Sequence, residues 1–202
     1  VLENISYHPK RAYTFLKRVM DILIAFVLGT VSLLAYPLVA LAIKLEDGGP
    51  IFIIQERVGK EGELIQLHKF RTMQTNDVNK PTLEDDPRIT RVGEFLRQSR
   101  IDELPQLWAV VLGRLSLVGP RPELPHFVEE YRKSIPLYDV RHIIPPGLSG
   151  WAQIRYDVPA YSVETNAKKL AYELYYIKNR SFFLDLRIAL KTIKTLLSRR
   201  GI

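Results

Sequence analysis

The sequence lacks cysteine altogether and has only four histidines among its 202 residues, at the scattered positions 8, 68, 126 and 142. The absence of cysteine excludes a disulfide scaffold, thiolate metal sites and a thiol nucleophile. The histidines show no metal-ligand spacing, so we interpret them as ordinary structural or surface residues. The chain also has no recognisable glycine-rich phosphate loop, dinucleotide-binding fingerprint, Ser/His/Asp order or internal repeat.

The composition indicates a folded domain with anionic partners. Hydrophobic residues make up 47% of the chain and charged residues 25%, which argues against disorder and supports one ordinary domain. Lysine and arginine outnumber the acidic residues and give a formal net charge of +7. This balance favours nucleic acid, phosphorylated metabolites or an anionic membrane surface as partners. Because the chain begins with Val1 and not with methionine, we expect a processed chain or a portion of a longer protein.

A run of 22 residues without a charge extends from Ile22 to Ile43. Its length is that of a membrane helix candidate, and a buried core helix is the alternative. No small-residue cleavage site follows it, which argues against a cleavable signal peptide. Pro37 lies inside the run, where proline bends a helix, and basic residues flank both ends. Since basic flanks are enriched on the cytoplasmic side, a re-entrant helix–break–helix hairpin fits the charges better than a single pass.

The C-terminal region predicts an amphipathic helix. An apolar stripe and a basic stripe recur there at helical spacing. The apolar stripe consists of Phe183, Leu186, Leu190, Ile193 and Leu197, and the basic stripe consists of Arg187, Lys191 and Lys194. Such a helix can lie on an anionic bilayer or pack on the core of its own domain, and the pattern leaves both interpretations open.

Residues 44–180 have the composition of a water-facing body. The strand-like runs at 51–58 and 63–73 are separated by Gly-Lys-Glu-Gly, which predicts a β-hairpin. In the second run, alternation places Leu67, Lys69 and Arg71 on one face. Two cations on one strand face usually mark a solvated surface, and this interpretation is favoured here over a phosphate site.

Two adjacent carboxylates, Asp102 and Glu103, follow two nearby arginines and precede Pro105. The helical pattern over 92–112 is interrupted near Pro105, so we expect Asp102 to cap a helix whose first turn contains that proline. Both carboxylates then lie near exposed N–H groups at the positive end of the helix dipole. Such a position keeps a carboxylate ionised and favours a bound phosphate, which suits a nucleophile toward phosphorus. The alternative is that Asp102 and Glu103 are ordinary surface carboxylates without a role in a site.

Arg121 lies in a rigid loop, because Gly119, Pro120 and Pro122 surround it. A guanidinium held in this way is preorganised to bind a phosphate with two parallel hydrogen bonds. Taken alone, the segment is a proline-rich turn that contains an arginine. The residues by themselves therefore support a basic, membrane-attached domain with several cation sites and one acid pair.

Seven segments in order resemble the bacterial sugar transferases, the monotopic phosphoglycosyl transferases that begin glycan assembly on a polyprenol carrier. The segments are LKRVMDILIA, FIIQERVG, HKFRTM, DPRITRVGEFLRQSRIDELPQLW, LSLVGPRPE, PGLSGWAQ and YELYYIKNRSFFLDL. The resemblance covers nearly the whole chain.

The resemblance implies a mostly helical α/β fold with amphipathic interfacial helices. Residues 1–44 would form an N-terminal amphipathic segment and a re-entrant membrane helix broken at Pro37. Residues 45–202 would form a catalytic domain on the cytoplasmic face of the bacterial inner membrane, including the C-terminal amphipathic helix. The implied reaction moves a sugar-1-phosphate from a UDP-sugar to undecaprenyl phosphate and releases UMP, which starts glycan assembly.

Site residues carry over from the resemblance one by one. Asp102 matches the nucleophile, and Glu103 matches its acidic partner; both are associated with Mg²⁺. Arg121 matches the phosphate-loop arginine, and Lys69 matches the basic strand residue near the site. Arg71 and Arg155 are candidates for further phosphate contacts.

We hypothesise two-step covalent catalysis, in which Asp102 first attacks the phosphorus nearest the sugar and the lipid phosphate then attacks the sugar-phosphoryl-aspartate. A single-step transfer in which Asp102 only holds metal is one alternative. A non-catalytic basic adaptor at the membrane surface is another. A nucleic-acid binder is disfavoured, because it leaves the hydrophobic run unexplained. Membrane lipids are expected partners, and a homodimer is one oligomeric state that the sequence leaves open. No residue can be assigned to recognition of the sugar.

Overall fold

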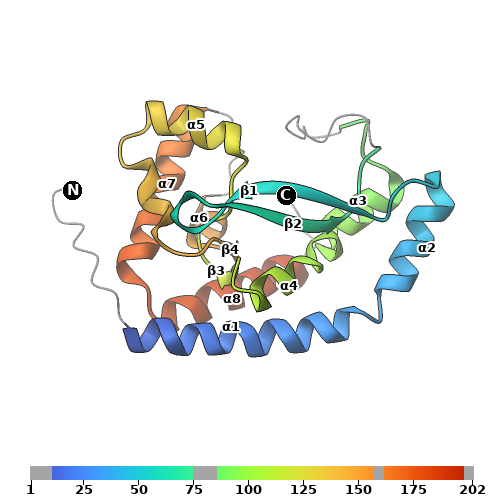
Figure 1. The fold of residues 1–202 in the computed structure, drawn as a ribbon, viewed down its shortest axis with the longest axis horizontal. Helices are drawn as coiled ribbons and strands as arrows, with labels where there is room; N and C mark the ends of the chain where they lie inside the picture. Colours follow the sequence, from blue (N-terminus) through green and yellow to red (C-terminus); the bar gives the residue numbers. More distant parts are fainter. Residues whose placement is uncertain (1–10, 75–85, 157–161, 198–202) are drawn as a thin grey trace.

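The computed structural model describes residues 11–74, 86–156 and 162–197, which form a mostly helical α/β fold (Figure 1). The N-terminal ten residues of the predicted amphipathic segment lie outside this description. The helices are α1 (Arg11–Ser32), α2 (Tyr36–Asp47), α3 (Arg91–Gln98), α4 (Gln106–Val111), α5 (Pro125–Ser134), α6 (Trp151–Arg155), α7 (Val163–Asn179) and α8 (Phe182–Leu197). The strands are β1 (Phe52–Val58), β2 (Leu64–Phe70), β3 (Ser116–Val118) and β4 (Gly147–Ser149). Three 3₁₀ turns are η1 (Lys60–Gly62), η2 (Ile101–Glu103) and η3 (Tyr138–Ile143).

The hydrophobic run forms two helices with a break between them, as the sequence predicts. Helix α1 lies along the base of the molecule in Figure 1, and α2 rises from its end at a bend of 54°. The break precedes Pro37, which sits in the first turn of α2, where its missing N–H costs no helical hydrogen bond. The chain turns instead through successive i→i−3 bonds, among them the one from Leu33 N to the carbonyl of Thr30. Among the residues described, no helix alone has the length and hydropathy of a membrane span, whereas the bent pair meets both criteria together.

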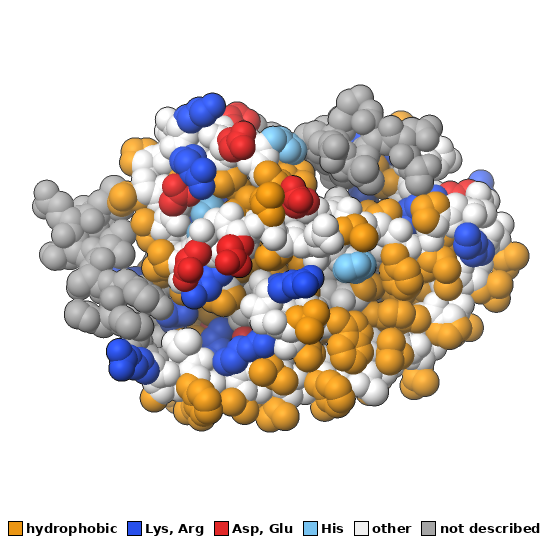
Figure 2. Space-filling view, in the orientation of Figure 1, with side chains coloured by type: hydrophobic (Ala, Val, Ile, Leu, Met, Phe, Trp, Pro, Cys, Tyr) orange, Lys and Arg blue, Asp and Glu red, His pale blue; other side chains and the backbone are white. Residues whose placement is uncertain are grey.

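Helix α1 buries one face and exposes the other. Its buried positions, Asp21, Ala25, Gly29 and Ser32, recur every three to four residues and face α4 and β3. Large apolar side chains on the other positions of α1 and α2 remain exposed, and Figure 2 shows them as an almost continuous apolar band over this edge. They include Phe15, Leu16, Leu23, Val27, Leu34 and Leu38.

The predicted hairpin is confirmed. Strands β1 and β2 pair antiparallel from Phe52↔Phe70 to Val58↔Leu64, and η1 forms their connection. The expectation that Lys69 and Arg71 mark a solvated face is wrong, because the side chain of Lys69 is 15% exposed and that of Arg71 only 4%. Acidic partners from other parts of the chain cover both cations.

Strands β3 and β4 pair in parallel, in the register Ser116↔Gly147 and Val118↔Ser149. Their backbones approach so closely beyond the ladder that a Cβ atom on Gly147 would lie 2.6 Å from Cα of Gly119. Glycine is therefore required at this contact. The pairing joins the two Gly/Pro turns that the sequence indicates as separate loops.

Helix α8 packs on its own domain with one face and leaves the predicted apolar stripe exposed. Ile188 is fully buried in a cluster with Trp151 and Tyr176, so the helix packs on its own domain. The apolar stripe predicted at Phe183, Leu186, Leu190 and Ile193 is nevertheless exposed. The side chain of Leu197 lies outside the described residues.

Candidate active site

The acid pair lies in the short turn η2 between α3 and α4. Arg100, which precedes the turn, adopts a left-handed conformation with φ of 57°, and it reverses the chain before the acids. The prediction that Asp102 caps a helix is wrong, because α4 begins at Gln106 after Pro105 and no side chain caps it. The chain leaves the helical path at Arg100, earlier than the proline signal suggested. A non-glycine residue in this conformation costs energy and is common at functional sites.

Glu103 binds both of the cations that the family resemblance assigns to the site, Lys69 and Arg121. Lys69 Nζ from β2 donates to Glu103 Oε1 at 2.9 Å, and Arg121 Nη2 donates to the same oxygen at 2.9 Å. The side chains of Lys69 and Glu103 are each 15% exposed. Burial alone would raise the pKa of Glu103, but the positive charges of Arg121 and Lys69 outweigh it and hold that pKa far below its usual range. Glu103 is therefore ionised at neutral pH.

Asp102 has the opposite environment. It is 8% exposed, and its Oδ1 is buried without a hydrogen-bond donor among the described residues. Burial, followed by the negative charge of Glu103, raises its pKa, while Lys69, Arg100 and Arg97 pull that pKa down. Environments that push the pKa values of two neighbouring carboxyls apart give them separate roles. Asp102 is therefore the more basic of the two carboxylates, and its Oδ1 accepts no hydrogen bond from the described part of the chain. Both properties suit it for attack on an electrophile.

The loop that carries Arg121 is held at successive carbonyl groups. Each carbonyl from residue 120 to 123 accepts a hydrogen bond from a residue outside the loop. The donors are Gly147 N to Pro120 at 2.8 Å, Arg141 Nη2 to Arg121 at 2.8 Å, Arg57 Nη1 to Pro122 at 3.4 Å and Val58 N to Glu123 at 2.9 Å. The loop is thus rigid by tertiary contacts as well as by its prolines.

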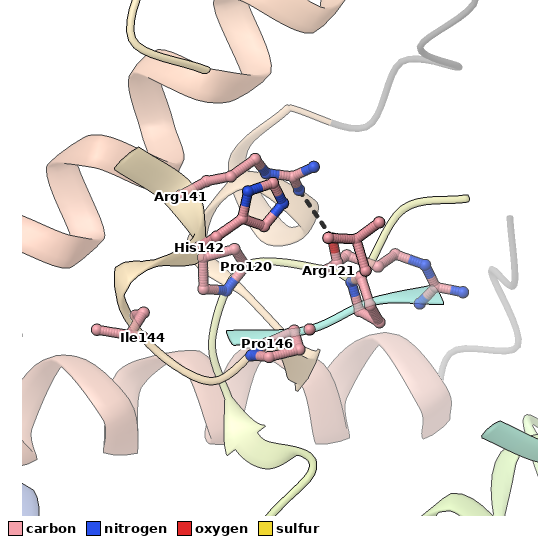
Figure 3. A pocket seen from close by; sticks show the side chains of 9 residues that line it. Pro120, Arg121, Arg141, His142, Ile144 and Pro146 are labelled. Carbon is pink, nitrogen blue, oxygen red and sulfur yellow. Dashed lines mark hydrogen bonds between the residues drawn. The ribbon is translucent and has the colours of Figure 1, made fainter. Parts of the chain in front are cut away.

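Arg121 and Arg141 line a small pocket together with Pro120, His142 and Pro146 (Figure 3). Figure 3 shows Arg141 reaching the carbonyl of Arg121, while the guanidinium of Arg121 extends away from it. The negative charge of Glu103 raises the pKa of Arg121. The Arg121 side chain is 34% exposed, so its guanidinium remains accessible to an anion while it contacts Glu103.

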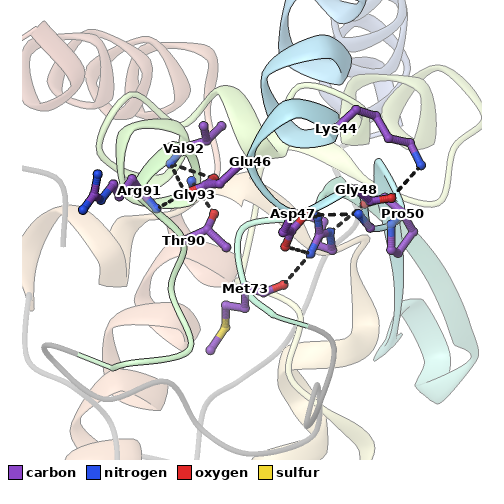
Figure 4. Close-up of polar contacts among 12 residues, drawn as sticks. Lys44, Glu46, Asp47, Gly48, Pro50, Met73, Thr90, Arg91, Val92 and Gly93 are labelled. Atoms are coloured by element: carbon purple, nitrogen blue, oxygen red, sulfur yellow. Dashed lines mark hydrogen bonds and ion pairs between the residues drawn. The ribbon is translucent and has the colours of Figure 1, made fainter.

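The structure brings Asp102, Glu103, Lys69 and Arg121 together, but it places Arg71 in a different contact. Arg71 lies just beyond the end of β2 and forms a fork with both carboxylate oxygens of Asp47, and its Nε donates to the carbonyl of Pro50 at 2.7 Å. Figure 4 shows these two partners, Asp47 and Pro50, close together where α2 ends. The hydrogen bond from Arg71 lowers the pKa of Asp47 to about 2. Arg71 therefore joins the end of α2 to the hairpin.

Arg155 stands apart from the acid pair in its described contacts as well. Its guanidinium carbon lies 4.5 Å from the centroid of the Trp151 ring, a cation–π arrangement at the end of α6. Neither Arg71 nor Arg155 therefore enters the chemistry proposed below.

Sequence reasoning assigned no role in the site to three further arginines, although it noted two of them beside the acid pair. Arg97 and Arg100 both lower the pKa of Asp102 through their charge, and Nε of Arg97 is held by Thr72 Oγ1 at 2.9 Å. Arg141, which supports the Arg121 loop, lies in η3 and carried no motif that pointed to the site. The only available signal was the proximity of Arg97 and Arg100 to the acid pair in the sequence.

The acid pair supplies two of the carboxylate ligands that a Mg²⁺ ion held jointly with substrate would need. In the part of the chain that the structure describes, no group of three or more acidic or histidine side chains could hold a metal by itself. Mg²⁺ commonly binds through one or two carboxylates plus phosphate oxygens, and it keeps several waters. The carboxylates of Asp102 and Glu103, which are adjacent in η2, are the residues that would hold such an ion.

Comparison with known proteins gives consistent relatives. The chain matches the family described as bacterial sugar transferase over residues 12–199. A protein of Aeromonas hydrophila named UDP-N-acetylgalactosamine-undecaprenyl-phosphate N-acetylgalactosaminephosphotransferase is 43% identical over 97% of this chain and 47% of its own length. Proteins named UDP-glucose:undecaprenyl-phosphate glucose-1-phosphate transferase are 38% identical in Escherichia coli and 40% identical in Caulobacter vibrioides. These matches cover 88% and 94% of this chain, and 39% and 73% of the relatives. The chain thus spans less than half the length of the Aeromonas and Escherichia relatives.

Proposed function

The chain belongs to the bacterial sugar transferase family, and we propose that it transfers a sugar-1-phosphate from a UDP-sugar to undecaprenyl phosphate with release of UMP. One observation supports this chemistry above the others. A buried carboxylate oxygen of Asp102 has no donor among the described residues, and it lies beside a Glu103 that Lys69 and Arg121 keep ionised. The names of the relatives supply the classes of donor and acceptor.

The reaction proceeds in two displacements. An oxygen of Asp102 attacks the phosphorus bonded to the sugar, and the bond to the UMP oxygen breaks, so that UMP leaves with the electron pair. An oxygen of undecaprenyl phosphate then attacks the same phosphorus, the bond to Asp102 breaks, and the lipid-linked diphosphate sugar leaves. Two steps allow a water-soluble donor and a membrane-bound acceptor to use one site in turn.

The surrounding residues stabilise the charge that develops during both steps. Arg121 and Lys69 face the phosphoryl oxygens from the loop and from β2, where positioned cations lower the barrier. Glu103 holds these two cations at the site, because both donate to its Oε1. Mg²⁺, when bound by Asp102, Glu103 and the diphosphate, would neutralise further negative charge on the substrate.

We place the enzyme at the cytoplasmic face of the bacterial inner membrane, with the α1–α2 pair as a re-entrant element. The support is the bend of 54° between two helices whose outer side chains are largely apolar and exposed. A re-entrant element keeps its basic flanks on one side of the membrane. It would hold the acid pair near the headgroup region, where the acceptor phosphate resides.

The decisive experiment incubates the protein with UDP-sugars alone, namely UDP-glucose, UDP-galactose and UDP-N-acetylgalactosamine. The covalent route releases about one equivalent of UMP per site without any lipid acceptor. Asp102→Asn abolishes this burst, while Asp139→Asn, which changes an exposed carboxylate paired with Arg132, preserves it.

Other outcomes separate the alternatives. A full burst from Asp102→Asn overturns the nucleophile assignment. Transfer that requires both substrates and shows no burst indicates a single-step reaction. Membrane binding without transfer from any donor indicates the non-catalytic adaptor.

A further inference from the structure

Arg141 and Glu173 form a buried fork between η3 and α7. Arg141 Nε donates to Glu173 Oε2 and Nη2 donates to Oε1, each at 2.8 Å. Their side chains are only 2% and 3% exposed. Arg141 Nη1 also donates to the hydroxyl of Tyr138 at 2.7 Å. The planar guanidinium is thus held in one orientation by contacts at three of its nitrogens.

The same guanidinium supports the residue that we assign to the phosphate. Nη2 of Arg141 donates to the carbonyl of Arg121 at 2.8 Å, and Arg121 in turn donates to Glu103. The flanking prolines fix φ at positions 120 and 122, and Pro122 also restricts ψ of Arg121 to the extended range. The hydrogen bond from Arg141 holds the carbonyl of Arg121 within that range, and so steadies the backbone from which the Arg121 side chain extends.

We propose that Arg141, locked by Glu173, is a positioning residue that holds Arg121 for phosphoryl transfer. The proposal rests on the function proposed above. A direct contact between Arg141 and substrate is disfavoured, because Arg141 is almost fully buried and its Nε, Nη1 and Nη2 all have protein partners. A purely structural ion pair is the competing explanation, since breaking a buried pair destabilises a fold.

A double-mutant cycle distinguishes positioning from stability. We expect Arg141→Lys, which keeps the charge and removes the fork, to slow single-turnover UMP release about 10- to 100-fold. The KM for UDP-sugar should change much less, because the main loss is in the transition state. In an Arg121→Ala background, Arg141→Lys should cause little further loss of rate, since the residue that it positions is already absent.

The matched control is Arg132→Lys. Arg132 lies in α5, and its Nε donates to both carboxylate oxygens of the exposed Asp139 in η3. Its replacement should leave the rate of UMP release unchanged. Thermal unfolding of every variant reports on the fold. If Arg141→Lys fails to fold, the double-mutant cycle with Arg121→Ala is repeated with Glu173→Gln. This substitution removes the negative charge that holds Arg141 and keeps the size of the side chain.

The outcomes are distinguishable. In one outcome, the double variant shows a loss in activation free energy equal to the sum of the losses from Arg121→Ala and Arg141→Lys. Such additivity overturns the positioning role of Arg141 and leaves the proposed function intact. A normal rate in Arg141→Lys and in Glu173→Gln also overturns it. A normal rate in Arg121→Ala contradicts the phosphate-binding role of Arg121, and with it the basis of both proposals.

Discussion

Lys69 and Glu103 are 34 positions apart in the sequence, yet their side chains form an ion pair of 2.9 Å with little exposure to solvent. The pair joins the β-hairpin to the turn that carries the acids. It lies beside Asp102, whose pKa the charge of Lys69 lowers. The state of the proposed nucleophile therefore depends on a residue of a different element.

Replacing Lys69 by methionine should move the acid limb of the pH–rate profile to higher pH. Lys69 lowers the pKa of both Asp102 and Glu103, so its removal raises both values, and Asp102 becomes ionised only at higher pH. The maximal rate should also fall about 100-fold, through the loss of a cation near the phosphoryl group. Rates of UMP release measured across pH check this. Lys168→Met, at an exposed pair with Glu164, is the control, and an unmoved acid limb in Lys69→Met would contradict the coupling.

Arg71→Lys should lower stability and leave donor binding nearly unchanged. Arg71 is buried, and its fork with Asp47 ties α2 to the hairpin, so the shorter lysine side chain loses several charged hydrogen bonds. We expect a loss of about 2 kcal/mol in the free energy of unfolding. The KM for UDP-sugar should change by less than about twofold. A rise in the KM for UDP-sugar at unchanged stability would instead indicate that Arg71 contacts the substrate phosphate.

Gly147→Ala should disrupt the contact between the two Gly/Pro turns. A methyl group there would overlap the backbone of Gly119, so β4 must move away from the Arg121 loop. We expect a loss of about 1–3 kcal/mol in stability, together with slower UMP release. Gly29→Ala is the comparison, since its Cβ would meet Trp108 at an ordinary 3.5 Å. Equal effects of the two substitutions on melting temperature would refute the close-contact argument.

His142 should make the fold sensitive to moderate acid. Burial, assisted by the charge of Arg141, lowers the pKa of His142 to about 4, whereas the unfolded chain has the ordinary value of 6.5. Below pH 6.5 the unfolded state takes up a proton that the folded state does not. Stability is therefore lost as pH falls from 6.5 to 4, by about 3 kcal/mol.

Unfolding measured between pH 7 and pH 4 tests the role of His142. His142→Gln should flatten the decline in stability over this range, because glutamine does not titrate. His68→Gln, at an exposed histidine of β2, should leave the decline unchanged. If the His142→Gln protein loses stability as steeply as the unsubstituted protein, another group is responsible.

Local patterns predicted much of the architecture. The Gly-Lys-Glu-Gly turn produced the β1–β2 hairpin, and the proline-containing apolar run produced the bent α1–α2 pair. Helical periodicity also located α8. Each of these signals acts over a few residues of chain, through turn chemistry or the spacing of apolar side chains. The helix-cap expectation for Asp102 failed because Ile101–Glu103 forms a 3₁₀ turn after the left-handed Arg100, and the next helix begins only at Gln106.

The linear order of residues was sufficient to single out Asp102, Glu103, Lys69 and Arg121 and to reveal the family, because their motifs recur in a recognisable sequence. Folding alone determined how the cations are distributed. It directed Lys69 to Glu103, drew Arg71 to Asp47, and placed Arg141 between Glu173 and the Arg121 loop. The physical reason is that charges interact through space at a few ångströms, whatever their separation along the chain, and burial sets the strength of that interaction.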